Sequence, residues 1–209
     1  MVTVALALVY VQSRQLLLSR NCYDSPVQIE TELDVLRDVS RRLEGAGIPF
    51  MPTGSLAMNY YAQPRMTRDI DIVIALDQTQ AETFFRLFDG DYYFARRNVA
   101  EAISRRGTFN LIHNDTVIKV DFVVLKTDPY RQEEFTRRKH VKIGDLETWI
   151  VSCEDLILSK LVWAEGSRSE MQFRDIRNLL SADCDSEYLH TRAKALNVDQ
   201  LLDEFIGNE

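Results

Sequence analysis

Apolar and polar residues alternate with the period of a β-strand in the run DIDIVI. Ile70, Ile72 and Ile74 occupy every second position, and Asp69 and Asp71 stand between them. Residues two apart in a strand face the same side of the sheet, so the pattern predicts a strand whose isoleucines enter the core. The two carboxylates then project together from the opposite face.

A second run, VIKVDFVV, spans Val117–Val124 and contains a single acid, Asp121. Its β-branched residues favour a strand, and we expect a β-hairpin formed by Thr108–Ile112 and Thr116–Val124. Burying a lone carboxylate is costly, so Asp121 needs a positive partner. Two partners are open here: a metal ion, which we favour, and Lys119, which lies two residues away on the same predicted face.

Other segments show helical spacing. We expect helices over Ile29–Leu43 and Gln78–Phe88. Apolar residues between positions 156 and 164 also recur every three or four residues, which sets Lys160 on or beside a buried stripe. Its ammonium group either meets an anion or reaches water along its extended stem. A following amphipathic helix carries Asp175, whose alternative role is a surface ion pair with a neighbouring arginine.

A Gly-Ser pair precedes the first aspartates. Gly54 lacks a side chain, so its backbone can approach a phosphate closely, and Ser55 adds a hydroxyl where a helix begins. Alone, the pair also fits an ordinary helix start. Followed closely by Asp69 and Asp71, it indicates a triphosphate site, and carboxylate oxygens on one rigid face suit Mg²⁺.

Composition limits the number of domains and the kinds of partner that we expect. The chain has 209 residues and a net charge of −7, which fits one compact domain with a helical extension and argues against a surface that coats nucleic acid. The apolar segment Val2–Val11 is too short to span a bilayer and lacks a basic leader, so we expect a strand, a packing segment or a start-site artefact and no membrane partner.

The cysteines are few and far apart, which indicates neither a disulfide framework nor a zinc site and favours the reducing cytoplasm. They are Cys22, Cys153 and Cys184.

The order Gly-Ser, Asp-x-Asp and a later strand aspartate resembles the nucleotidyltransferase superfamily with the DNA polymerase β-like fold. The chain is most similar to the AbiEii-type group and its relatives, because Thr67 and Arg68 lead into Asp-Ile-Asp and a second block follows at Glu154–Leu180. The resemblance implies an α/β (α+β) mixed-sheet core with a C-terminal helical extension. We expect an N-terminal segment at 1–28, the core at 29–152, and a helical region at 153–209 that completes the nucleotide site.

The resemblance also implies roles for individual residues. The carboxylates would be catalytic and would bind two Mg²⁺ ions, while a second set would bind the NTP substrate. The catalytic and metal-binding residues would be Asp69, Asp71 and Asp121, and the nucleotide-binding residues would be Gly54, Ser55, Thr67, Arg68, Lys160 and Asp175. Asn178 departs from the pattern, which often has an acid there.

The predicted reaction is attack of an acceptor hydroxyl on the α-phosphorus of an NTP, with release of pyrophosphate. The AbiEii-like pattern implies a toxin of a toxin–antitoxin or phage-defence system that modifies RNA, such as tRNA, or a protein, and that has a cognate antitoxin. The alternatives are an antitoxin-type adenylyltransferase acting on a partner toxin, an enzyme that nucleotidylates antibiotics, and a catalytically silent nucleotide-binding regulator.

Overall fold

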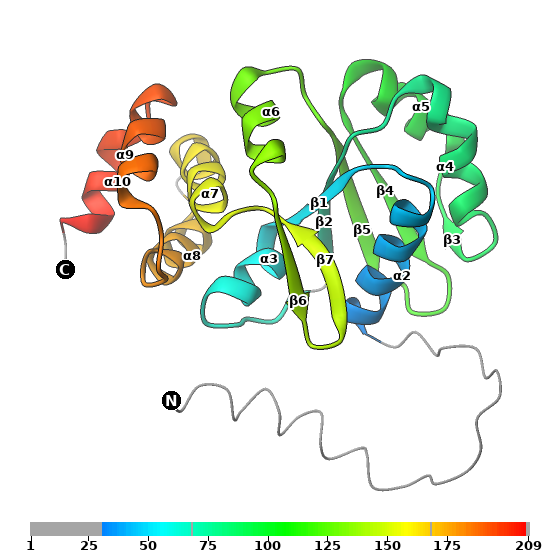
Figure 1. Ribbon diagram of the computed structural model, residues 1–209, viewed down its shortest axis with the longest axis horizontal. Coiled ribbons are helices and arrows are strands. Elements are labelled where there is room, and N and C mark those ends of the chain that lie inside the picture. Colours follow the sequence, from blue (N-terminus) through cyan, green and yellow to red (C-terminus); the bar gives the residue numbers. More distant parts are fainter. Residues whose placement is uncertain (1–30, 68, 168, 208–209) are drawn as a thin grey trace, which may run out of the picture.

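The computed structural model describes residues 31–67, 69–167 and 169–207 (Figure 1). Several features named above lie outside the described residues: the N-terminal segment expected at 1–28, with Val2–Val11 and Cys22, the start of the helix predicted from Ile29, and Arg68.

A five-stranded mixed sheet forms the centre of the molecule (Figure 1). Its spatial order is β1-β2-β5-β4-β3, in which β2 and β5 run parallel and all other neighbours run antiparallel. The strands are β1 (Phe50–Thr53), β2 (Asp69–Ile74), β3 (Tyr92–Tyr93), β4 (Thr108–His113) and β5 (Lys119–Val124). The predicted hairpin is therefore present, although its second strand begins at Lys119.

The predicted alternation in β2 is confirmed. Ile70, Ile72 and Ile74 are fully buried, whereas the residues between them are exposed or half-buried. The isoleucines belong to a core formed with three helices. These helices are α2 (Glu32–Gly45), α4 (Ala81–Phe88) and α5 (Arg96–Arg105). The segment predicted as one helix over Gln78–Phe88 starts with a short 3₁₀ turn, η1 (Gln78–Gln80), which has no buried residue.

Helix α2 starts at a capped residue. Thr31 accepts a hydrogen bond from the Asp34 backbone, and the Asp34 carboxylate accepts one from the Thr31 backbone. This reciprocal capping box satisfies amide groups that have no partner inside the helix. Among the described residues, the helix predicted over Ile29–Leu43 therefore begins at Glu32.

A second core lies on the side of the sheet that carries the aspartates. It joins β1 and α3 (Gly54–Tyr61) to the C-terminal helices. A hairpin of β6 (Lys139–Ile143) and β7 (Leu146–Ile150) leads into these helices. The remaining helices are α6 (Pro129–Thr136), α7 (Cys153–Ser167), α8 (Glu170–Leu180), α9 (Ser186–Ala195) and α10 (Asp199–Ile206). In Figure 1, α9 and α10 lie at the opposite end of the molecule from α4 and α5. No helix in the described part of the chain is long and apolar enough to cross a membrane.

Candidate functional site

The Gly-Ser turn lies against Asp71, the second aspartate of Asp-Ile-Asp. Strand β1 passes directly into α3 at Gly54, whose φ of 64° is a left-handed conformation that favours glycine. A Cβ atom at this position would lie 2.0 Å from Oδ2 of Asp71. The missing side chain therefore makes the space that the carboxylate occupies, which links two motifs that are separate in the sequence.

The parallel pairing of β2 and β5 aligns the carboxylates. Asp71 lies opposite Asp121 in the register, and Asp69 lies opposite Lys119. Burial raises the pKa of Asp71, and the negative charges of Asp121 and Asp69 raise it further. A site that raises the pKa of an acid in this way is one that a cation would stabilise.

Lys119 already brings one positive charge to this site. Its Nζ lies 2.7 Å from Oδ2 of Asp121 and 3.7 Å from Oδ1 of Asp69. The hydrogen bond with Asp121 raises the pKa of Lys119. The pairing of Asp121 with Lys119, one of the two alternatives that the sequence left open, is therefore present. The ammonium group lies where a positive charge can contact two carboxylates.

Within the described ranges, no group of three or more His, Cys, Asp or Glu side chains is arranged to hold a metal ion. The acidic donors that β2 and β5 bring together on this face of the sheet are nevertheless all carboxylate oxygens, the ligands that Mg²⁺ prefers. The assignment of Asp69, Asp71 and Asp121 as metal ligands stays a prediction.

A chain of polar contacts connects the Gly-Ser turn to α7 and α8. Arg65 donates to Ser55 Oγ at 2.5 Å and, through Nε and an Nη, to both carboxylate oxygens of Asp175 at 3.1 and 3.0 Å. Lys160 Nζ lies 2.8 Å from Oδ2 of Asp175 and 3.3 Å from Gln172. Residues from three distant parts of the sequence thus meet beside the turn.

These contacts decide two alternatives that the sequence left open. The Lys160 side chain is only 7% exposed and the Asp175 side chain 2%, so the solvent-reaching lysine and the surface ion pair are both wrong. Burial works to raise the pKa of Asp175, but hydrogen bonds from Arg65 and Lys160 outweigh it and lower that pKa. Sequence reasoning missed Arg65, although an arginine close before Asp-Ile-Asp was a visible signal.

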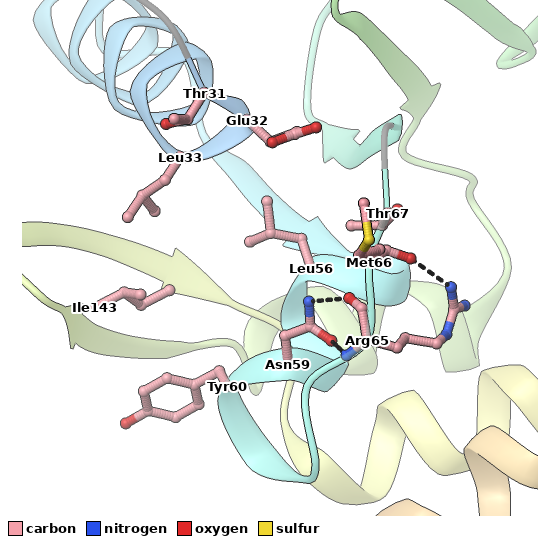
Figure 2. Close-up of a pocket in the computed structure, with 10 residues that line it drawn as sticks. All are labelled: Thr31, Glu32, Leu33, Leu56, Asn59, Tyr60, Arg65, Met66, Thr67 and Ile143. Carbon is pink, nitrogen blue, oxygen red and sulfur yellow. Dashed lines mark hydrogen bonds between the residues drawn. The ribbon is translucent and has the colours of Figure 1, made fainter. Parts of the chain in front are cut away.

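The loop that carries Arg65 is held at both ends. The Asn178 side chain exchanges hydrogen bonds with the backbone of Gln63, at 3.2 and 2.9 Å. Asn59 does the same with the backbone of Arg65, at 2.9 Å in each direction (Figure 2). Thr67 donates to the Asp69 carbonyl at 3.2 Å. Asn178, which departs from the usual pattern, therefore positions the loop.

A cavity of about 340 Å³ lies next to this loop (Figure 2). Its wall combines apolar side chains from α2, α3 and β6 with the polar loop residues. The lining residues are Thr31, Glu32, Leu33, Leu56, Asn59, Tyr60, Arg65, Met66, Thr67 and Ile143. Its volume is in the range of small-molecule pockets.

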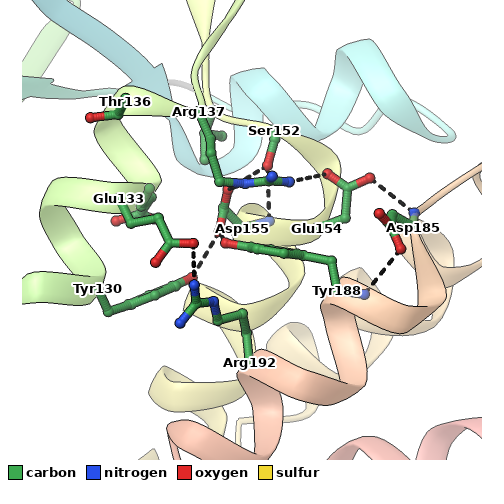
Figure 3. Close-up of polar contacts among 12 residues, drawn as sticks. Tyr130, Glu133, Thr136, Arg137, Ser152, Glu154, Asp155, Asp185, Tyr188 and Arg192 are labelled. Carbon is green, nitrogen blue, oxygen red and sulfur yellow. Dashed lines mark hydrogen bonds and ion pairs between the residues drawn. The ribbon is translucent and has the colours of Figure 1, made fainter.

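A separate polar cluster ties α6 and α9 to the start of α7 (Figure 3). Asp155 is fully buried and accepts hydrogen bonds from Ser152 at 2.6 Å and Tyr188 at 2.8 Å. Arg137 approaches the same carboxylate at 3.0 Å and stacks over the Tyr188 ring. Every charge here has a partner inside the protein, so the cluster joins the helical region to the core.

Solved structures share this fold at low sequence identity. An antigenic nucleotidyltransferase-like protein from Paracoccidioides brasiliensis gives a TM-score of 0.54 at 16% identity, over 84% of this chain and 91% of that chain. The lincosamide antibiotic adenylyltransferase LnuA, with lincomycin bound, gives 0.51 at 16% identity, over 74% and 99%. The antibiotic-resistance factor ANT(2'')-Ia gives 0.52 at 12% identity, over 84% and 96%.

No protein-family model and no curated protein sequence matches the chain. The structural similarity shows a nucleotidyltransferase-like fold, as the motifs predicted. The narrower resemblance to AbiEii-type proteins stays a prediction.

Proposed function

We propose that the protein is a magnesium-dependent nucleotidyltransferase that moves a nucleoside monophosphate from an NTP to an acceptor hydroxyl. The observation that carries the proposal is the contact between Gly54 and Asp71, in which a glycine turn at a helix start lies directly against a carboxylate. A triphosphate bound at that turn would meet backbone N–H groups on one side and the carboxylates on the other.

The donor chemistry fits Mg²⁺. Two observations support this fit: any Cβ would fill the space at Gly54, and the Lys119 ammonium group already brings a positive charge to the carboxylates. Asp69 and Asp71 would hold one ion, and Asp121 would help to hold a second. When bound, Mg²⁺ supplies positive charge beside the triphosphate and lowers the pKa of a hydroxyl that contacts it.

The chain's own groups would bind and orient the substrate. Ser55 and the Gly54 backbone would hold the β- and γ-phosphates, and Thr67 and Arg68 would border them. Lys160 would offset the charge that develops on the leaving pyrophosphate, because preorganised cations stabilise such charge without reorganisation. Asp175 would hold Lys160 in place through the 2.8 Å ion pair.

The acceptor belongs to one of three chemical classes. RNA, including a tRNA end, and a partner protein follow from the AbiEii-like pattern, which also implies a toxin–antitoxin role. A small-molecule acceptor enters because LnuA, one of the structural neighbours, is an antibiotic adenylyltransferase. The 340 Å³ cavity beside Arg65 would accommodate a small-molecule acceptor.

The test is label transfer from each α-labelled NTP with Mg²⁺, offered total RNA, cell lysate and a panel of lincosamides and aminoglycosides. Asp71→Asn should abolish both transfer and pyrophosphate release. The matched control is Asp203→Asn, which removes an exposed carboxylate on α10 and should leave both unchanged.

The labelled fraction names the acceptor class. Transfer that survives Asp71→Asn would refute the metal assignment. Nucleotide binding without pyrophosphate release would refute the transferase proposal in favour of a regulatory binder.

A further inference from the structure

Two cysteines that are far apart in the sequence meet where α7, α8 and the α8–α9 connection converge. Cys153 is the first residue of α7, and Cys184 lies just before α9. Their Sγ atoms are 2.8 Å apart and share a hydrogen bond. Both sulfurs also approach the carbonyl oxygen of Leu179, at 4.0 and 3.9 Å. Both are free thiols in the structure, and the sequence spacing gave no sign of this proximity, which arises from packing of the α8–α9 connection against the start of α7.

The two thiols differ in solvent exposure and in pKa. Cys153 is 2% exposed, whereas Cys184 is half-buried and can be reached from solvent. The hydrogen bond between them lowers the pKa of Cys184 and raises that of Cys153. Cys184 is therefore the more accessible thiol and carries more thiolate, which is the form that reacts with oxidants.

We propose that Cys153 and Cys184 are a dithiol site that a hydroperoxide oxidises to an intrachain disulfide. The Cys184 thiolate attacks the nearer peroxide oxygen, which breaks the O–O bond, forms a sulfenic acid and releases an alkoxide or hydroxide that takes up a proton. The Cys153 sulfur then attacks Sγ of Cys184 and loses its proton, and the sulfenic oxygen leaves as water. Two thiols lose two electrons in total, and the peroxide gains them.

The disulfide would close a loop that contains all of α7 and α8. Lys160 and Asp175, whose ion pair joins these helices, both lie inside that loop. A cross-link limits the conformations of the unfolded chain, so the oxidised form should be the more stable one. The proposal stands independently of the proposed enzymatic function, since it depends only on where the two sulfurs lie.

The experiment uses the full chain with Cys22→Ser, so that only this pair remains. The reduced protein is treated with equimolar hydrogen peroxide, its remaining thiols are alkylated with iodoacetamide, and intact mass is measured before and after reduction. We expect loss of two hydrogens, no alkylation, and a peptide that joins Cys153 to Cys184 in a non-reducing digest. The midpoint temperature of thermal unfolding should rise by roughly 5 to 10 °C on oxidation and should return to its original value after treatment with dithiothreitol.

Cys153→Ser in the same background is the matched control. It keeps the accessible thiol but removes its partner, so the sulfenic acid at Cys184 should persist and react with dimedone. Two alkylated thiols after peroxide treatment would overturn the proposal, as would a disulfide found only between chains. A sulfinic acid at Cys184 beside a free Cys153 would overturn it as well, because the second step would then be too slow to compete.

Discussion

Replacing Gly54 with alanine tests the contact on which the candidate site depends. Two costs are expected. A left-handed φ costs an L-residue roughly 1–2 kcal/mol. The added Cβ would also lie 2.0 Å from Oδ2 of Asp71, a separation that forces the carboxylate to move. Displacing a packed side chain typically adds about 1–3 kcal/mol, so Gly54→Ala should lower the free energy of unfolding by roughly 2–5 kcal/mol.

Gly47→Ala is the matched control. Gly47 has nearly the same φ, 65°, but a Cβ there would meet nothing within 4 Å. It should therefore show only the backbone cost of roughly 1–2 kcal/mol. The difference between the two variants in urea unfolding isolates the contact with Asp71.

The same pair of variants distinguishes a loss of stability from a loss of metal binding at the site. Displacing Asp71 should weaken Mn²⁺ binding by roughly tenfold or more, measured by calorimetry on the folded protein without nucleotide, whereas Gly47→Ala should bind Mn²⁺ as the wild type does. If Gly54→Ala matched Gly47→Ala in both stability and metal affinity, the inferred contact between turn and carboxylate would be refuted.

Three further predictions address the charges around the site. Lys119→Met removes the ammonium group that competes with Mn²⁺ for Asp121. An exposed ion pair is worth up to about 1 kcal/mol, so Mn²⁺ should bind up to roughly fivefold more tightly in calorimetry. Weaker binding would contradict this prediction. Asp175→Asn leaves Lys160 buried without its partner and should cost about 3–5 kcal/mol at pH 7 in urea unfolding. Because the folded pKa of Asp175 is lowered, its stabilisation is present above the unfolded pKa of about 3.9 and is lost as pH falls through the folded pKa, so the gap between variant and wild type should shrink below about pH 4. Asp155→Asn should also cost about 3–5 kcal/mol, since it removes the buried carboxylate charge that Arg137 contacts, but should leave nucleotide binding by the folded protein intact in fluorescence titrations.

Local patterns predicted the parts of the fold that depend on near neighbours in the chain. The alternation around Ile72 identified β2 and the face from which Asp69 and Asp71 project, because side-chain direction in a strand follows from backbone geometry alone. Helical spacing likewise set Lys160 beside a buried stripe. The order of motifs was enough to predict the fold that the solved structures share.

Contacts between distant residues could not be read in the same way. Spacing left Lys160 and Asp175 each with an exposed alternative, and only the packing of α7 against α8 with the Arg65 loop made them buried partners. Helix boundaries also shifted where a cap decided them, as at Thr31 before α2.

By itself, the sequence predicted β2, the hairpin of β4 and β5, the helical spacing of α2, α4, α7 and α8, and the shared face from which Asp69 and Asp71 project, since these follow from short-range geometry. Tertiary structure alone decided that Gly54 makes room for Asp71, that Lys119 sits between two carboxylates, and that Cys153 reaches Cys184. The physical reason differs between them: Gly54 reaches Asp71 through the pairing of β1 with β2, Lys119 reaches Asp69 through the parallel pairing of β2 with β5, and the two cysteines meet only when the C-terminal helices pack together.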